Sequence, residues 1–205
     1  GGVQIKSDTI VTIADAQILY AQWTANEYTV TFDAKGGTVA PATITVTYDG
    51  TYGELPEPTR IGYTFDGWFT AASGGVQVKS DTIVTIAGDQ TLYAQWKVNE
   101  YTVTFDAKGG TVTPATITVT YDGAYGQLPE PTRDGYTFAG WFTAAEGGTR
   151  VTSDTVVAIT ADQTLYAQWT VNDYTATFDA NGGTVTPATI TVTYGGIYGE
   201  LPVPS

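Results

Sequence analysis

Residues 28–38 read YTVTFDAKGGT, and this phrase decides the fold because it combines a strand, a turn and a repeat. Large apolar residues alternate with Thr, the period-2 pattern of a half-buried strand. The Lys-Gly-Gly that follows supplies the positive-φ positions that a tight turn needs. The phrase begins again at Tyr101 and, with two changes, at Tyr174, so both intervals are 73 residues (101 − 28 and 174 − 101). Such a period is typical of a tandem array of small folding units.

The period divides the chain into two complete repeats between two partial ones. The complete repeats, residues 28–96 and 101–169, are identical at 56 of 69 aligned positions. Residues 1–23 match 74–96 and are expected to be the C-terminal part of a preceding repeat, while residues 174–205 are expected to be the N-terminal part of a following one. Because the sequence contains no Met, we expect it to be an internal piece of a longer protein.

The connections between repeats are short and contain neither Gly nor Pro, which predicts restricted hinge angles and an elongated, semi-rigid array. The predicted linkers are residues 24–27, 97–100 and 170–173. A different phase, with units that begin at Gly1, Gly74 and Gly147, remains open at this point. We also expect both partial repeats to be held by contacts. One form would be head-to-tail pairing between copies, a kind of contact that generates fibres when it does not close.

Within one repeat the pattern is that of several short strands. Ile44, Val46 and Tyr48 alternate with Thr and predict a second strand, antiparallel to the first. Residues 51–60 contain two prolines and predict a crossover loop, with one helical turn at residues 53–55. An aromatic cluster and a closing LYAQW strand follow. Because no segment shows a sustained 3.6-residue period, the fold class predicted is β-rich, from all-β to α+β.

Composition excludes several classes of function. There is no Cys for thiolate metal sites and no His for a nucleophilic triad. The net charge of −13 repels phosphate backbones, so nucleic acid is not expected as a partner. No apolar run approaches the roughly 20 residues that span a bilayer, so no membrane insertion is expected within this segment.

Three separated motifs in the right order resemble one known family. The opening YTVTFDAKGGT, the middle LPEPTR-x-GYTF-x-GWFT and the closing LYAQW are similar to the Listeria–Bacteroides repeat, also known as the internalin B-type repeat. The resemblance covers essentially the whole chain and implies small β-grasp-like (ubiquitin-like) domains in tandem, as in large bacterial surface proteins. Since residues 51–60 offer little for the helix of a β-grasp fold, we expect that helix to be reduced or absent. The family supplies no catalytic residues to carry over.

The charged residues do not indicate catalysis or a cofactor. Two carboxylates of the first repeat change in the second, where Asp66 becomes Ala139 and Glu54 becomes Gln127. An enzyme is therefore not expected. For calcium, the recurring Asp positions are Asp33, Asp106 and Asp179, and separately Asp8, Asp81 and Asp154. Neither set lies in a dense run of carboxylates, so we interpret them as turn-capping residues and predict no metal site.

Aromatic side chains are the candidates for ligand binding. Tyr63, Phe65, Trp68 and Phe69, with counterparts in the second repeat, could form a sugar-binding platform, but a small unit without disulfides also needs them for its core. We expect the core to consist of Tyr28, Phe32, Phe65, Trp68, Trp96 and their counterparts. The candidate ligand-binding residues are Tyr63, Trp68, Tyr136 and Trp141.

Two functional hypotheses follow from the repeat. The first is a structural stalk or spacer of a bacterial cell-surface adhesin or filament, extracellular or attached to the cell wall, with neighbouring repeats or copies of the chain as partners. The alternative is a set of ligand-binding adhesin repeats that recognise a glycan or a host protein through many weak sites.

Overall fold

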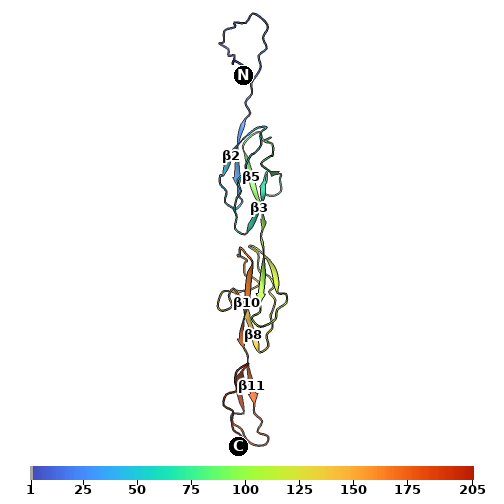
Figure 1. The fold of residues 1–205 in the computed structure, drawn as a ribbon, viewed down its shortest axis with the longest axis vertical. Helices are drawn as coiled ribbons and strands as arrows, with labels where there is room; N and C mark the ends of the chain where they lie inside the picture. The colour runs from blue at the N-terminus through green and yellow to red at the C-terminus, as the bar shows by residue number, and fades with distance from the viewer. Residues whose placement is uncertain (1) are drawn as a thin grey trace.

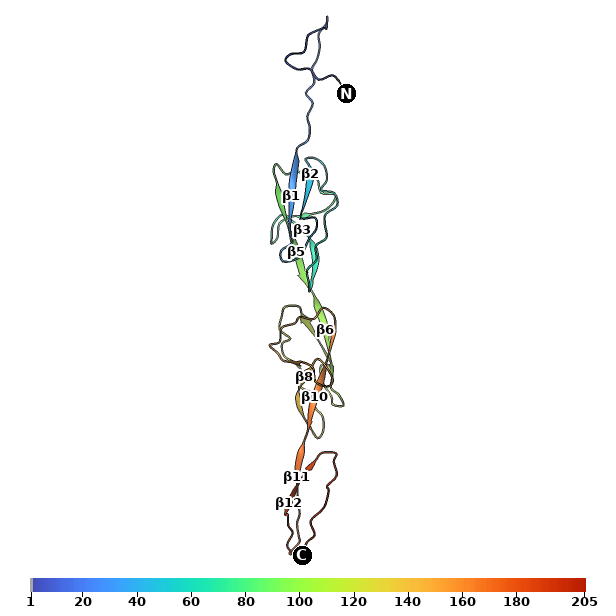
Figure 2. The same ribbon diagram turned by 90° about the vertical axis from the view of Figure 1, so that its left-hand side faces the viewer.

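The computed structural model describes residues 2–205 as a row of separate β-sheets strung along one axis. Figures 1 and 2, which differ by a quarter turn, show the same narrow, elongated outline. Among the described residues there is no helix, so the structure confirms the β-rich class and the absence of the β-grasp helix.

The first unit is a five-stranded mixed sheet. Its strands are β1 (Glu27–Asp33), β2 (Thr43–Thr47), β3 (Tyr63–Phe69), β4 (Gln77–Val78) and β5 (Gln90–Val98), in the order β2-β1-β5-β3-β4. The central pair β1 and β5 is parallel, and every other neighbouring pair is antiparallel. A parallel pair requires a long crossover. The chain between β1 and β5 supplies it, by building β2, β3 and β4 on either side of the central pair.

The second unit repeats this sheet, and a hairpin follows it. The strands of the second unit are β6 (Glu100–Asp106), β7 (Thr116–Thr120), β8 (Tyr136–Phe142), β9 (Arg150–Val151) and β10 (Gln163–Val171). Their order, β7-β6-β10-β8-β9, is that of the first sheet. The C-terminal hairpin consists of β11 (Asp173–Thr177) and β12 (Thr189–Thr193).

A small core built around one tryptophan holds each sheet together. Trp68 is 2% exposed, and Val30, Val84 and Leu92 are fully buried around it. The core prediction is confirmed, with Phe32 also buried and the remaining predicted members packed against it half-buried, namely Tyr28, Phe65 and Trp96. The second unit reproduces this core around Trp141.

A proline-containing loop takes the place of the helix over this core. The indole N–H of Trp68 donates a hydrogen bond of 2.7 Å to the carbonyl oxygen of Pro56, and Tyr52 and Pro58 are buried beside it. The helical turn expected at residues 53–55 is wrong, because the chain there forms a bend without helical hydrogen bonds. Pro56 lacks the N–H that would bond back to the preceding turn, and a proline disfavours helical backbone in the residue before it, so Leu55 and Glu57 favour extended chain.

The two partial repeats differ in structure. Residues 2–26 form no strand and are exposed, and Trp23 has 92% of its surface exposed. The expectation that this segment is held is therefore wrong within the single chain; Gly1 lies outside the described residues. The C-terminal segment is held, because its hairpin continues directly from the second sheet and contacts it.

The chain passes from one sheet to the next almost without a break. Lys97 and Val98 are the last residues of β5, and Glu100 is the first residue of β6. Only Asn99 lies between the two strands, and Asn172 has the same position between β10 and β11.

Candidate functional site at the junctions between repeats

The structure separates the four aromatic residues predicted to bind a ligand. Trp68 and Trp141 are each 2% exposed, and their indole N–H groups donate to the carbonyl oxygens of Pro56 and Pro129. Tyr63 and Tyr136 are instead half-buried at the first positions of β3 and β8, where one repeat meets the next. The tryptophans thus belong to the cores, and the tyrosines belong to the junctions.

Asn99 joins the two repeats by hydrogen bonds to both. Its backbone N–H donates to the Gly62 carbonyl oxygen at 2.9 Å, and its carbonyl oxygen accepts from the Tyr121 N–H at 3.0 Å. Its side-chain Oδ1 accepts from the Thr64 hydroxyl at 2.6 Å. The main-chain and side-chain groups of Asn99 therefore fix the path of the chain between the two sheets. Few backbone torsions at this position remain free to act as a hinge.

The ring of Tyr121, from the second repeat, packs on the backbone of Gly62, from the first. Gly62 is buried and has a φ of +77°, a conformation that other residues adopt only with strain. A Cβ atom at this position would overlap the Tyr121 ring. Tyr121 also meets Tyr63 edge to face, with ring centroids 5.8 Å apart. The absence of a side chain at residue 62 thus makes the docking surface.

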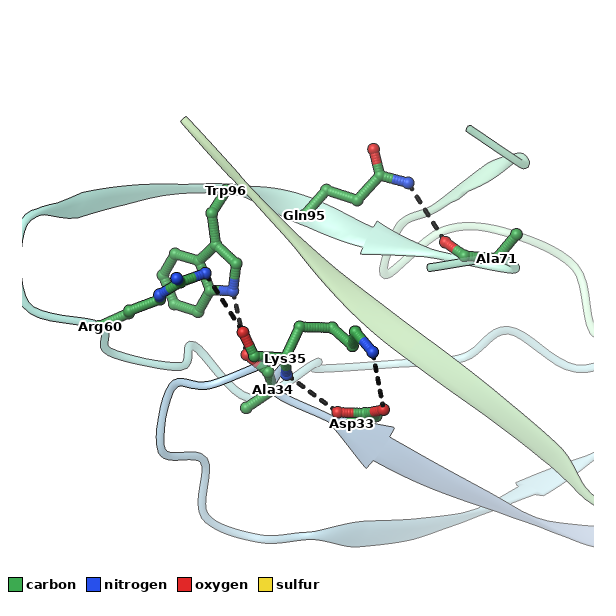
Figure 3. A network of polar contacts seen from close by, with 7 residues as sticks. All are labelled: Asp33, Ala34, Lys35, Arg60, Ala71, Gln95 and Trp96. Carbon is green, nitrogen blue, oxygen red and sulfur yellow. Dashed lines mark hydrogen bonds and ion pairs between the residues drawn. The ribbon is translucent and has the colours of Figure 1, made fainter. Parts of the chain in front are cut away.

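A stacked arginine completes the junction and connects it to the core. The Arg60 guanidinium carbon lies 3.7 Å from the centroid of the Tyr63 ring, within the range of a cation–π contact. Its Nη1 donates to the Lys35 carbonyl oxygen at 3.2 Å, and the neighbouring Ala34 carbonyl accepts from Trp96 Nε1 at 3.0 Å (Figure 3). The turn after β1 is therefore the anchor that holds Arg60 against Tyr63.

The second junction repeats these contacts but lacks a hydrogen bond that crosses the first. Asn172 bonds to Gly135, Tyr194 and Thr137 as Asn99 does to their counterparts, and Arg133 stacks on Tyr136 at 3.7 Å. At the first junction the Tyr63 hydroxyl also donates to the Asp122 carboxylate at 3.0 Å. This hydrogen bond, more than partial desolvation and the charge of Asp122, raises the pKa of Tyr63. The position of Asp122 is Gly195 at the second junction, so that bond is missing there.

An open groove runs along each junction. The first, of about 600 Å³, lies between the Gly36-Gly37 turn and the side chains of Tyr63, Tyr121 and Asp122. The second, of about 440 Å³, has the equivalent position. Over residues 2–205 no group of three His, Cys, Asp or Glu side chains could hold a metal ion. The junction residues can therefore position one repeat on the next and can offer hydroxyl, guanidinium and aromatic surface to a ligand.

Sequence reasoning missed Asn99, Gly62 as a packing surface, and Tyr121. The sequence pattern predicts for Tyr48, the counterpart of Tyr121, only a place in a strand. The signal available was recurrence, because each of these residues returns at a 73-residue interval.

Within the described part of the chain, no helix has the length and apolar character to cross a membrane.

Comparisons with known proteins give one family and a consistent set of relatives. The family model described as the Listeria-Bacteroides repeat domain matches residues 28–95, 101–168 and 174–205. Internalin H of Listeria monocytogenes is 41% identical over 71% of this chain and 26% of its own length. Two proteins of Evansella cellulosilytica, whose names describe a Gly-rich membrane protein and a membrane protein, are 33% and 31% identical over 83% and 84% of this chain. The chain spans 19% and 25% of their lengths.

Proposed function

Because the chain belongs to the Listeria-Bacteroides repeat family, we propose that its repeats act as a semi-rigid spacer that sets a distance between other parts of a longer protein. The matching family is a repeat domain rather than an enzyme family. The proposed work is mechanical and involves no reaction, cofactor or metal.

The observation that carries this proposal is the junction. A spacer needs units that cannot fold back on one another, and here a single residue lies between the last strand of one sheet and the first strand of the next. Asn99 and the Tyr121–Gly62 contact then fix the second sheet on the first. The same contacts recur at Asn172 and Tyr194, so each added repeat would extend the array in the same manner.

The relatives support a place for this spacer outside the cell. Internalin H and the two proteins named as membrane proteins each contain a region similar to this chain within a much longer sequence. We therefore propose that the repeats form the stalk of a bacterial surface protein. Head-to-tail contacts between copies stay a prediction of the repeat pattern. The net charge of −13 would favour the solubility of such stalks.

Small-angle scattering of the 205-residue chain tests the spacer role. We expect an elongated particle, as in Figure 1, and a broader distribution of shapes when Tyr121→Ala and Tyr194→Ala remove both docking rings. Tyr48→Ala is the matched control, because this equivalent tyrosine is 41% exposed and residues 2–26 before its repeat form no strand. A compact wild-type particle, or equal flexibility of all three proteins, would contradict the proposal.

The repeated groove favours a second candidate function, ligand binding by the junctions. Tyr63 and Tyr136 line the two grooves together with Arg60 and Arg133, a combination that can contact a glycan or an extended protein segment. Glycan-array binding that weakens when both Tyr63→Ala and Tyr136→Ala are introduced would support this function. Trp68→Ala is unsuitable as a test, because it removes the centre of the core.

A further inference from the structure

The strand β2 forms a free edge of the first sheet, and its counterparts do so in the other units. β2 comes first in the order β2-β1-β5-β3-β4, and the opposite edge is the two-residue β4. β7 begins the second sheet in the same way, and β12 pairs only with β11. All three edge strands have the sequence TITVT.

The phase of the ladder shows which backbone groups face outward. Phe32 N–H donates to the Ala42 carbonyl, and Tyr48 N–H donates to the Asn26 carbonyl. In an antiparallel pair, hydrogen-bonded and non-hydrogen-bonded positions alternate. Ile44 and Val46 therefore bond to β1, whereas the backbone N–H groups of Thr43, Thr45 and Thr47 point away from it. Among residues 2–205, one backbone hydrogen bond uses these outward groups, from Gly50 N–H to the Thr47 carbonyl.

This edge lacks the devices that usually keep edge strands apart. TITVT has no charged residue and no proline, and the pairing of β1 with β2 runs without a bulge over Thr43–Thr47. Native sheets protect such edges with charges, prolines, bulges or covering segments. The three threonines are exposed, and among the described residues no strand pairs with this edge. Its short length and the charge of the whole chain are the remaining protection.

We propose that these edges pair with the same strands of a second copy, antiparallel, so that two chains associate side by side. TITVT reads the same in both directions apart from the exchange of Ile44 and Val46. A two-fold axis at Thr45 would place Thr45 opposite itself and Thr43 opposite Thr47 of the second copy, at hydrogen-bonded positions. Ile44 would then lie beside Val46 of the second copy on the core side, as in an ordinary cross-strand apolar pair.

The self-complementary sequence makes a second copy the favoured occupant of the edge. An unrelated peptide would need its own matching pattern of apolar and polar residues, whereas a second copy presents the same near-palindromic TITVT strand. One five-residue edge gives a weak contact by itself, and each chain carries three such edges. The charge of −13 on each chain opposes this association, and added salt screens that repulsion. The association is therefore expected to strengthen as salt increases.

Sedimentation velocity on the intact chain tests the proposal with a matched pair of variants. The Thr45→Pro, Thr118→Pro and Thr191→Pro triple variant removes the outward N–H groups, and proline is tolerated at such edge positions. The corresponding triple Ala variant shortens the side chains but keeps the N–H groups. We expect wild-type and Ala proteins to associate as concentration and salt rise, and the Pro protein to stay monomeric with an unchanged circular dichroism spectrum. A monomeric wild type, or equal association of the Pro and Ala proteins, would overturn the proposal.

A cysteine cross-link tests the two-fold arrangement directly, since the chain contains no Cys. Opposed residues at hydrogen-bonded antiparallel positions have Cα atoms about 5.5 Å apart, within disulfide range. We expect Thr45→Cys, Thr118→Cys and Thr191→Cys proteins, oxidised alone or in pairwise mixtures, to give covalent dimers that show which units meet. Val76→Cys, on an exposed loop, is the control and should stay monomeric. Should no mixture exceed this control, the edge pairing is wrong.

Discussion

The two junctions are the same interface formed with different amounts of structure behind it. At the first, Tyr121 belongs to a complete five-stranded sheet. At the second, Tyr194 belongs to a hairpin of two strands, and yet it packs on Gly135 as Tyr121 packs on Gly62. The ring centroids of the two tyrosine pairs are 5.8 and 5.9 Å apart. Docking is therefore a property of the first hairpin of a repeat and does not require its complete sheet.

One hydrogen bond between neighbouring repeats is present at the first junction and not at the second, and it can be set apart from the contacts that both junctions share. The Tyr63–Asp122 bond is present at the first junction and absent at the second, where Gly195 replaces the aspartate. The asparagine, the glycine and the stacked arginine are the same at both. The comparison predicts that the shared contacts fix the geometry and that the Tyr–Asp bond contributes little to it.

The largest effect is expected from a side chain at the docking glycine. Gly62→Ala and Gly135→Ala should each weaken docking by about 2–4 kcal/mol, because positive φ strains alanine by roughly 1–2 kcal/mol and the methyl group overlaps a tyrosine ring. Urea unfolding of the intact chain, together with its scattering profile, measures both consequences.

Gly53→Ala isolates the contribution of the tyrosine contact. Gly53 has a φ of +70°, close to that of Gly62, but a Cβ there would meet nothing within 4 Å. It should cost only the backbone strain and leave the scattering profile unchanged. If Gly53→Ala and Gly62→Ala had the same effects, the tyrosine would not be the docking contact.

An intermediate effect is expected at the two junction asparagines. Asn99→Ala and Asn172→Ala each remove an acceptor for a threonine hydroxyl at 2.6 Å, from Thr64 and Thr137 respectively. A neutral hydrogen bond contributes about 0.5–1.5 kcal/mol, and this one is partly open to solvent. Thr64→Ala removes the donor of the same bond, so a double-mutant cycle with Asn99→Ala gives the energy of the interaction. No coupling in that cycle would contradict the assignment.

The smallest effect distinguishes the junctions from each other. Tyr63→Phe should loosen the first junction slightly, because it loses the bond to Asp122, whereas Tyr136→Phe should have no such effect at the second. Gly195→Asp should install the missing bond, since Asp122 already has a φ of +60°, similar to the +73° of Gly195. Chemical-shift changes at Asn99 and Asn172 report each junction separately, and equal responses to the two phenylalanine changes would contradict the comparison.

The pKa shift of Tyr63 gives this comparison a pH dependence. Because the pKa is raised in the folded state, the contribution of Tyr63 is complete below the ordinary tyrosine value of about 10 and is lost as pH rises through the higher folded value. Signals at Asn99 should therefore change at alkaline pH in the wild type. In Tyr63→Phe this alkaline change at Asn99 should disappear. Tyr52 and Tyr125, whose pKa values are raised by burial, should titrate in both proteins.

The strands and the core could be predicted from the sequence because they depend on local alternation. The pattern around Val30 and Phe32 and the closing LYAQW both gave strands that the structure contains. The junction could not be predicted in this way. Tyr121 continues the alternation of β7 at the first residue after that strand, but its contact is with a glycine 59 residues away, and no periodicity links the two. Trp68 and Tyr63 share one aromatic cluster in the sequence, and only the bulged pairing of β3 with β5 shows that one lies in the core and the other at the boundary.

The docking of β11–β12 on the second sheet also implies a direction of assembly. The surface that receives a new repeat includes Gly135, on an already completed sheet, and the part that it receives is the first hairpin of the next repeat. During synthesis, which starts at the N-terminus, the first hairpin of a repeat can therefore be oriented by the completed repeat before it. The remaining strands of the new repeat are synthesised later. Each repeat of the array would therefore take its orientation from the repeat that folded before it.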